Sequence, residues 1–417
     1  MNRRQLLQGI SAAGAGALIP GPNAWASALT PNPATRRLIV VFLRGAVDGL
    51  SIVVPYSEPN YYRMRSTIAI AKPGSTGGAI DLDGRFGLHP ALAPLYPLWK
   101  QGTMAFVHAA GSPDPTRSHF DGQDNIESGA PGQKAIADGW LNRLEGSLPA
   151  DALLRAAPTR AVSIGAVSPR IFMGSNPVTT VASGATAVRP SVLDKPNVQE
   201  AFSSIYSDDH EMGSTFNEYV AARKNVVAAL AAADPETMAA NNGAPSSYAF
   251  AEDAARLATL MRRDPRVQLG FLAVSGWDTH ANQGGAEGQL SNLLTPFARG
   301  MATLAQNLGP IYADTTIVVL SEFGRTVAQN GNGGTDHGHG NAMWLLGGNV
   351  AGGKVYGDWT GLEDGQLHEG RDLPVTTDYR TVLAQVCERH LRLPDSRLSD
   401  VFPSMPKLDN RISLING

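Results

Sequence analysis

Short, continuous apolar runs alternate with longer helical patterns along most of this chain. The first run, Leu38–Leu43, is apolar at every position, which is typical of a strand buried on both faces of a sheet. Similar runs recur at Met104–Val107, Ala161–Ile164, Val267–Val274, Thr316–Leu320 and Ala342–Leu346. Helical patterns occur at Pro90–Lys100, Thr215–Ala233, Ser246–Arg263, Gly285–Leu308 and Asp378–Leu391. This alternation predicts an α/β fold with a mostly parallel central sheet and helices on both faces.

The same pattern predicts one large domain. We expect residues 27–417 to form a single α/β domain, because no break in composition divides them. Residues 197–263 are expected to form a helical insertion packed on the sheet. Gly174–Pro196 is rich in Gly, Pro, Ser and Thr and is predicted to be a long surface loop. Because Cys387 is the only cysteine, the fold is expected to contain no intramolecular disulfide.

The N-terminal segment, residues 1–26, is typical of a twin-arginine signal peptide. Arg3 and Arg4 precede a weakly apolar stretch, Ile10–Ile19, and residues 24–26 read Ala-Trp-Ala, a pattern that signal peptidases cleave. The stretch is about half as long as the ~20 apolar residues that a membrane span needs, so a membrane anchor is the weaker interpretation. We therefore expect export by the twin-arginine translocase to the periplasm or another exported location. No later apolar run is long enough to cross a bilayer.

The charge balance argues against one class of partner. The chain carries 34 basic and 37 acidic residues, a formal net charge of -3. Proteins that hold nucleic acid electrostatically carry a clear excess of Lys and Arg. We therefore expect no nucleic-acid partner.

Polar side chains gather after the apolar runs, where the predicted strands end. Ligands of open α/β sheets bind beyond these carboxyl ends. The polar segments are Arg44–Gly49, His108 with Arg117–Asp121, Ser275–His280, Ser321–Thr326 and, before the last run, Asp336–Gly340. Five of the nine histidines fall within them, namely His108, His119, His280, His337 and His339. This clustering indicates a functional site more strongly than any single motif does.

One of these segments has the composition of a metal site. Asp336, His337 and His339 lie close together among glycines, which let a backbone wrap closely around a ligand. Two imidazoles and a carboxylate suit zinc, manganese or iron, whereas the alternative is a flexible polar loop. Asp278 and His280 form a second short motif, for which the alternative is a turn with a capping Asp and an exposed His.

Other residues in these segments have a functional and a structural interpretation. Ser118 offers a hydroxyl nucleophile close to helix N-terminal amides, or it is a helix N-cap. Arg44 and Arg325 are candidates for binding a phosphate or sulfate group, or they pair with structural carboxylates. Glu322 is a candidate metal ligand or an acid at a helix N-terminus. Because the chain has no G-x-S-x-G motif, a Ser-His-Asp hydrolase is poorly supported.

These segments resemble the domain-of-unknown-function 1501 family, exported bacterial proteins related to the sulfatase and alkaline phosphatase superfamily. The resemblance covers nearly all of residues 27–417 and implies an alkaline phosphatase-like fold. The motifs that carry it are Leu43–Leu50, Phe86–Leu92, Ser118–Gln123, Gly276–His280, Ser321–Thr326 and Thr335–Gly340.

The resemblance also implies roles for single residues, because the superfamily has a two-metal phosphatase or sulfatase site. Ser118 matches the nucleophile that attacks the ester. The positions that match metal ligands, in identity or in kind, are Asp48, Asp278, His280, Glu322, and His337 or His339.

The chain departs from the superfamily pattern in two places. The Asp278–His280 motif has a shorter spacing than the superfamily pattern. Phe323 stands where a metal-binding His is usual, so the second metal loses a ligand unless His119 or His108 replaces it. One metal, held by the Asp278–His280 motif and the Asp336–His339 loop, is therefore the better supported prediction.

We expect an exported, metal-dependent hydrolase of phosphate or sulfate esters, with a small molecule or a glycan as substrate. The predicted cofactor is a divalent metal, zinc in the first place, with manganese, iron or calcium as alternatives. Ser118 or a bound water would attack the ester, and Arg44 or Arg325 would hold the developing charge. The alternative is a non-catalytic exported protein on the same fold that assembles with an envelope partner. Phe323 and the short Asp–His spacing motivate this alternative.

Overall fold

The computed structural model describes residues 35–149, 160–183, 240–408 and 412–416. The predicted signal peptide, the helix predicted at 215–233 and residues 197–239 of the predicted insertion lie outside the described residues. Residues 36–417 cluster as one unit by their internal contacts. No helix in the described ranges is long and apolar enough for a membrane crossing.

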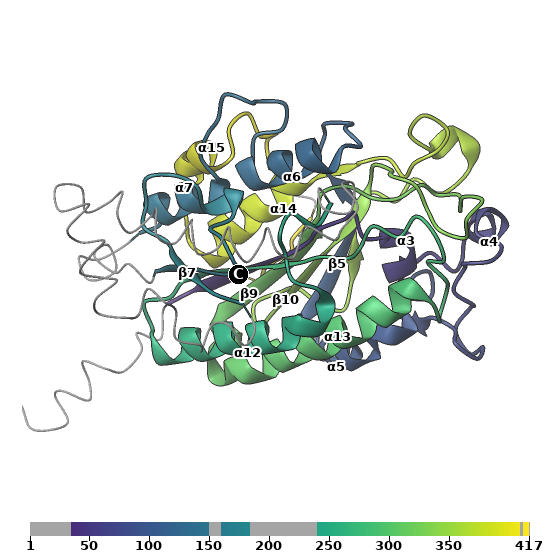
Figure 1. The fold of residues 1–417 in the computed structure, drawn as a ribbon, viewed down its shortest axis with the longest axis horizontal. Helices are drawn as coiled ribbons and strands as arrows, with labels where there is room; N and C mark the ends of the chain where they lie inside the picture. Colours follow the sequence, from purple (N-terminus) through teal and green to yellow (C-terminus); the bar gives the residue numbers. More distant parts are fainter. Residues whose placement is uncertain (1–34, 150–159, 184–239, 409–411, 417) are drawn as a thin grey trace, which may run out of the picture. The chain divides into compact units, whose positions relative to one another are not determined.

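Nine strands of the described chain form one central sheet in the order β11-β5-β10-β9-β1-β8-β6-β7, with β12 beside β5 (Figure 1). All pairings are parallel except those of β10 with β5 and β9. Each of the six predicted strands coincides with or overlaps one of these strands, which confirms the predicted α/β class. The strands are β1 (Arg37–Leu43), β5 (Met104–Gly111), β6 (Ala161–Ile164), β7 (Thr179–Val181), β8 (Leu269–Val274), β9 (Thr315–Ser321), β10 (Asn341–Gly347), β11 (Val355–Tyr356) and β12 (Thr377–Asp378).

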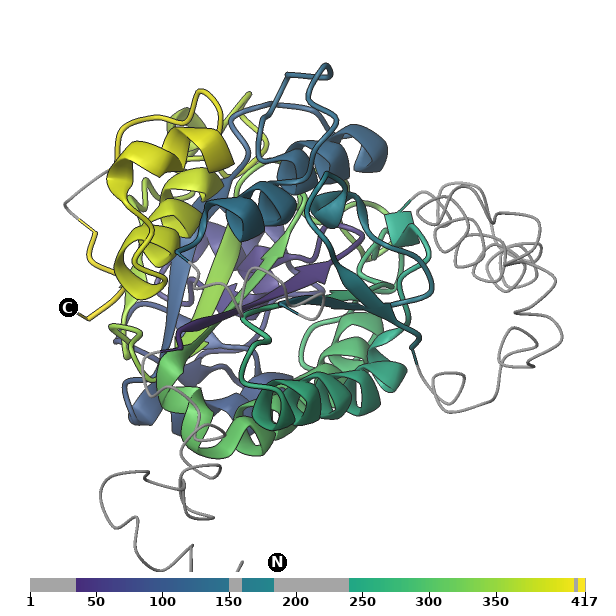
Figure 2. The same cartoon turned by 90° about the vertical axis from the view of Figure 1, so that its left-hand side faces the viewer.

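The central strands are apolar at every position because both faces of the sheet are covered. On β1, Ile39 and Val41 pack into one core, whereas Val40 and Phe42 pack into another. Successive side chains of a strand point to opposite faces, so a strand between two cores must be apolar throughout. The two helical layers above and below the sheet are visible in Figures 1 and 2.

Each core is closed by its own helical layer. The first layer contains η1 (Pro90–Leu95), α5 (Tyr96–Lys100), α12 (Ser247–Arg263), α13 (Gln289–Leu308) and η5 (Gly309–Asp314). The second layer contains α6 (His119–Ser128), α7 (Trp140–Ser147), η2 (Arg170–Phe172), α14 (Tyr379–Gln385), the π-helical turn η7 (Val386–His390), η8 (Asp395–Arg397) and α15 (Leu398–Val401).

Short elements complete the fold. A small second sheet has the order β2-β4-β3 and consists of β2 (Val53–Val54), β3 (Ile80–Asp81) and β4 (Gly87–Leu88). The remaining short helices are α3 (Gly49–Ile52), α4 (Pro59–Met64) and η6 (Asp364–Gln366).

The structure departs from the predicted elements in three places. The predicted loop Gly174–Pro196 contains β7, which pairs with β6. The helix predicted at Pro90–Lys100 starts with the 3-10 turn η1, because Pro94 lies inside it and supplies no backbone N–H donor. The described end of the predicted insertion is α12, which packs on α13 and β8 and therefore belongs to the helical layer.

The direction of β10 brings the Asp336–Gly340 loop to the site, a position that the order of the elements in the sequence does not reveal. The parallel strands end at the same edge of the sheet, where the segments after β1, β8 and β9 lie. Because β10 runs antiparallel to β9, the residues before β10 reach this edge. The Asp336–Gly340 loop therefore joins the segments that follow the other strands.

Candidate metal centre

Three histidine side chains converge on one carboxylate oxygen at this edge. Asp278 Oδ1 lies 3.0 Å from His280 Nε2, 3.3 Å from His337 Nε2 and 3.5 Å from His119 Nε2. His280 Nε2 and His337 Nε2 are 3.0 Å apart. His119, Asp278 and His337 each offer a ligand atom, and these atoms all lie within 4.8 Å of one another. We call these four residues the histidine–aspartate cluster, or the cluster for short.

The second ring nitrogen of each histidine faces an oxygen acceptor. His119 Nδ1 lies 2.8 Å from Glu322 Oε1, and His337 Nδ1 lies 2.8 Å from the carbonyl oxygen of Arg117. His280 Nδ1 lies 3.3 Å from Asp336 Oδ1. Because a carbonyl and an ionised carboxylate only accept hydrogen bonds, each Nδ1 carries the proton. When these rings bind a cation in their neutral form, the Nε2 lone pairs are the ones that point into the cluster.

Glu322 and Asp336 support the cluster from outside. Glu322 is buried, and its Oε1 also accepts from Gly45 N at 2.8 Å and from Gln123 Nε2 at 3.2 Å. Asp336 Oδ1 accepts from Asn330 Nδ2 at 2.9 Å. Both carboxylates were predicted as metal ligands, but in the structure each contacts the outer nitrogen of a histidine ring and not the centre of the cluster. Carboxylates in this position orient the histidine ligands of metal sites.

Arg325 is buried and holds the Asp278 side chain of the cluster. Its side chain is 0% exposed, and its Nη2 donates to Asp278 Oδ1. Nε donates to the carbonyl oxygen of Ala46 at 2.6 Å, and Nη1 donates to that of Thr335 at 3.0 Å. A guanidinium so fully engaged orients Asp278 and has no access to a substrate. The prediction that Arg325 binds an anionic group does not fit these contacts.

Backbone pairing between two glycine-containing loops brings His337 to the cluster. Gly324 N donates to His339 O at 2.8 Å, and Gly338 N donates to Gly324 O at 2.8 Å. A Cβ on Gly324 would lie 1.8 Å from the carbonyl oxygen of Gly340, so only glycine allows this approach. The glycines of the predicted metal loop thus let it pack on the loop after β9.

The start of α6 contributes His119. Ser118 is the N-cap, and its Oγ accepts from Asp121 N at 3.4 Å. This is the structural role that the sequence left as an alternative for Ser118. The Ser118 side chain is nevertheless exposed. It also lies between two residues that contact the cluster, Arg117 through its carbonyl oxygen and His119 through its ring.

Phe323 forms an aromatic wall of the cluster. Its ring stacks on His119 at 5.1 Å between centroids and 28° between planes. The same ring lies 5.1 Å from that of His337. The position where the superfamily pattern has a ligand therefore holds a side chain that packs on two histidines of the cluster.

Asp48 does not join the cluster. Arg65 donates to both of its carboxylate oxygens, at 3.0 Å for Nη2 to Oδ1, and both side chains are buried. Oδ2 also accepts from Ser51 Oγ and Gln283 Nε2, each at 2.7 Å. Burial alone would raise the pKa of Asp48, but Arg65 outweighs burial and lowers it. The predicted metal ligand is a structural ion pair instead.

Three more candidates lie outside the cluster. Arg44 is buried, donating to Gln123 and, at 2.7 Å, to Glu127 Oε1, so the prediction that it binds substrate does not fit. His339, a predicted ligand, stacks on the His368 ring at 4.6 Å. His108, a predicted replacement ligand, donates through Nε2 to the carbonyl oxygen of Val53 at 2.9 Å and lies in the core.

The sequence predicted His119 as a metal ligand only in one case, as a replacement for the histidine that is usual at the position of Phe323. Its side chain is 3% exposed, and its Nε2 is a buried ring nitrogen without a hydrogen-bond partner. An orphaned buried nitrogen is rare and needs an explanation. The signal in the sequence is its place in the His-Phe-Asp motif directly after a candidate N-cap.

The electrostatics of the cluster favour a bound cation. Burial alone would raise the pKa of Asp278, but the three histidines and Arg325 outweigh it and keep the pKa far below its usual value. Burial alone would lower the pKa of His119, but the carboxylates of Asp278 and Glu322 raise it to about 9. The carboxylates thus attract positive charge, which either protons or a metal ion can supply.

The donor set fits a transition metal. Three imidazole nitrogens with fixed tautomers and one carboxylate are ligands that zinc, manganese and iron accept. The orphaned Nε2 of His119 and the short contact between His280 Nε2 and His337 Nε2 both become favourable with a cation between them. Calcium prefers oxygen ligands, so it is the least suited of the predicted ions.

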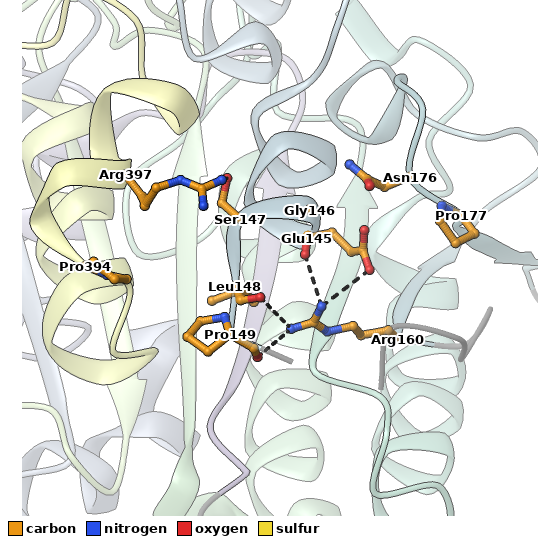
Figure 3. Close-up of a pocket in the computed structure, with 10 residues that line it drawn as sticks. All are labelled: Glu145, Gly146, Ser147, Leu148, Pro149, Arg160, Asn176, Pro177, Pro394 and Arg397. Carbon is orange, nitrogen blue, oxygen red and sulfur yellow. Dashed lines mark hydrogen bonds and ion pairs between the residues drawn. The ribbon is translucent and has the colours of Figure 1, made fainter. Parts of the chain in front are cut away.

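A cavity of about 560 Å³ has no cluster residue in its lining, and Figure 3 shows the residues that line it. Arg160 lines it and directly precedes β6, so the cavity is at the amino end of that strand. The guanidinium of Arg160 donates to the carbonyl oxygens of Glu145 and Pro149, each at 3.1 Å. The contacts of this arginine hold the surrounding backbone together.

The fold and the cluster define an α/β protein with a candidate metal centre at the carboxyl edge of its sheet. The chain belongs to the family described as protein of unknown function (DUF1501), which it matches over residues 99–402. No curated protein matches the chain.

Solved structures to which the chain is similar share little sequence with it. Ps i-CgsB in complex with k-i-k-neocarrahexaose is 10% identical, with a TM-score of 0.41 over 92% of this chain and 75% of that one. A protein in the alkaline phosphatase superfamily from Vibrio parahaemolyticus is 10% identical, with a TM-score of 0.34 over 77% and 62%. Phosphonoacetate hydrolase from Sinorhizobium meliloti 1021 is 12% identical, with a TM-score of 0.31 over 70% and 57%.

Proposed function

We propose that this chain is a metal-dependent hydrolase of phosphate or sulfate esters. The observation that carries the proposal is the convergence of three imidazole Nε2 atoms on Asp278, each ring held through Nδ1 by an oxygen. Structural zinc sites close their coordination with protein ligands, whereas catalytic sites keep an open position. His280 is 35% exposed, so the cluster is open to solvent on that side.

The residues proposed to hold the metal are Asp278, His119, His280 and His337. A divalent cation bound there would polarise an ester and stabilise the charge that develops on its oxygens. Glu322 and Arg325 would keep the ligands in position.

Ser118 is the proposed nucleophile. Its hydroxyl is exposed at the N-terminus of α6, directly before His119. The partial positive charge of a helix N-terminus favours a nearby anion. The Ser118 oxygen would displace the alcohol of the ester, which leaves with a proton. Water would then release the anion and restore the hydroxyl.

Export is part of the proposal. The pattern of residues 1–26 supports passage through the twin-arginine translocase, which carries folded proteins and so permits a metal to be loaded beforehand. The substrate would then be a small-molecule or glycan ester outside the cytoplasm.

Hydrolysis of aryl phosphates and aryl sulfates by the purified chain tests the proposal. We expect turnover that a chelator abolishes and that added zinc or manganese restores. Ser118→Ala is expected to lower the rate by about 10³-fold or more, as loss of a nucleophile does in other hydrolases. Ser75→Ala is the control and should leave the rate unchanged, because Ser75 is an exposed serine distant in sequence from Ser118 and from the cluster residues. Absence of turnover across a broad panel, with metal bound, would favour the non-catalytic alternative.

A further inference from the structure

An ester with an anionic group needs a positive side chain that it can reach. Arg44 and Arg325 are buried and paired with carboxylates of the protein, Glu127 and Asp278. Arg117 and Arg371 are 29% and 43% exposed and are tied to the cluster through His337. The carbonyl oxygen of Arg117 lies 2.8 Å from His337 Nδ1, and Arg371 Nη2 donates to the carbonyl oxygen of His337 at 2.6 Å. The Arg371 guanidinium is therefore fixed at the backbone of a proposed metal ligand. The Arg117 guanidinium lies beside it, because both donate through Nη2 to Asp372 Oδ2, at 2.6 Å from Arg117 and 3.2 Å from Arg371.

One buried carboxylate holds both arginines. Asp372 is 0% exposed, and its Oδ2 accepts from Arg117 Nε at 3.0 Å and Nη2 at 2.6 Å. Its Oδ1 accepts from Arg371 Nε at 2.9 Å. The two guanidinium groups thus share one buried carboxylate, so one positive charge is not balanced by Asp372 and can attract a second anion.

Glu369 currently supplies that anion. Its Oε2 lies 2.6 Å from Arg117 Nη2, although the side chain is 58% exposed. Exposed ion pairs stabilise proteins little, so this contact can be exchanged for another anion at small cost. Asp372, by contrast, is buried and stays in place.

The backbone at Glu369 is strained. Residues 368–371 form a tight turn in which Arg371 N donates to His368 O at 3.1 Å, and both central residues have positive φ, +54° at Glu369 and +64° at Gly370. Turns of this kind favour Asn followed by Gly, since a longer side chain is disfavoured at positive φ. Strain at such a position points to a role for the side chain itself.

We propose that Arg117, assisted by Arg371, binds the tetrahedral oxyanion of the substrate, and that the Glu369 carboxylate occupies the same guanidinium until the oxyanion displaces it. This inference rests on the proposed function, because it assigns the substrate-binding residues of that site. A guanidinium binds two oxygens of a phosphate or sulfate with its planar donors, so Arg117 suits either anion.

Isothermal titration calorimetry with inorganic phosphate and inorganic sulfate, on the zinc-loaded full chain and on the metal-free chain, tests the proposal. Glu369→Asn should tighten binding about 3- to 10-fold, because it removes a competing charge. Arg117→Met should weaken binding by about 10-fold or more, because a charge-assisted hydrogen bond is lost. Both variants are expected to fold, since Asn suits the turn and Asp372 keeps Arg371 as a partner.

Glu252→Gln is the matched control, because Glu252 is 56% exposed, pairs with Arg256 on α12 and carries the same charge. This variant should leave the affinities for phosphate and for sulfate unchanged. Tighter binding of phosphate than sulfate, or the reverse, supports the proposal and assigns the ester class. Unchanged or weaker binding in Glu369→Asn, or unchanged binding in Arg117→Met, overturns it. Because binding is measured without turnover, a chain that lacks hydrolysis but shows these shifts would contradict only the proposed function.

Discussion

Replacing His337 by alanine is expected to lower the affinity of the chain for zinc by at least ~100-fold. Loss of an outer partner of a ligand already lowers metal affinity about 10- to 100-fold, and loss of a ligand should exceed this. His337 Nε2 lies 3.3 Å from Asp278 Oδ1 and 3.0 Å from His280 Nε2, so it is central to the cluster. Competition with a chromophoric chelator measures the change.

His339→Ala is the control for this experiment. His339 lies two residues further along the same loop, but its ring stacks on His368 outside the cluster. We expect its substitution to leave the zinc affinity unchanged. Equal losses in the two variants would show that the loop as a whole, rather than His337, is responsible for binding.

Replacing Asp48 by asparagine is expected to destabilise the fold by about 3–5 kcal/mol, because it leaves a buried guanidinium without its counter-charge. The carboxylate oxygens of Asp48 both accept from Arg65, whose side chain is 0% exposed. Urea denaturation measures the loss of unfolding free energy. The zinc affinity of the variant that remains folded should equal that of the wild type.

Asp400→Asn provides the comparison for stability, because the Asp400–Arg397 pair is about half exposed at both ends. Its removal should change the unfolding free energy by less than about 1 kcal/mol. A small stability change in Asp48→Asn together with weaker zinc binding would return Asp48 to the list of metal ligands.

The fold could be predicted because buried strands have a recognisable apolar sequence pattern. A strand covered on both faces, such as β1, is apolar at each position, and this pattern is independent of distant partners. The edge that holds the site could also be predicted from the residues after β8 and β9. The loop before β10 reaches the same edge only because β10 runs antiparallel to β9, which the sequence did not predict.

The sequence predicted Asp278, His280 and His337, which lie in the cluster, but it did not separate them from the other predicted ligands. His337 and His339 have the same neighbours in sequence, yet only His337 faces Asp278, because the backbone pairing with Gly324 sets the direction of each ring. Asp48 was predicted as a ligand because it matches the superfamily's Asp after the first strand. Nothing near it in the sequence shows that Arg65, at the end of α4, would reach both of its oxygens. Such assignments depend on side-chain directions that only the folded chain defines.

The identity of the outer carboxylates was hidden for the same reason. Glu322 and Asp336 carry the chemistry of ligands, and a sequence does not distinguish a carboxylate that binds a metal from one that orients a histidine. Their contacts with His119 Nδ1 and His280 Nδ1 make that distinction.

Anomalous diffraction from zinc-loaded crystals tests the central claim most directly. The account predicts one peak bounded by the Nε2 atoms of His119, His280 and His337 and by the Asp278 carboxylate, at about 2.0–2.2 Å from each ligand atom. A peak at Asp48 or Glu322, or a zinc-saturated crystal without a peak at the cluster, would contradict it.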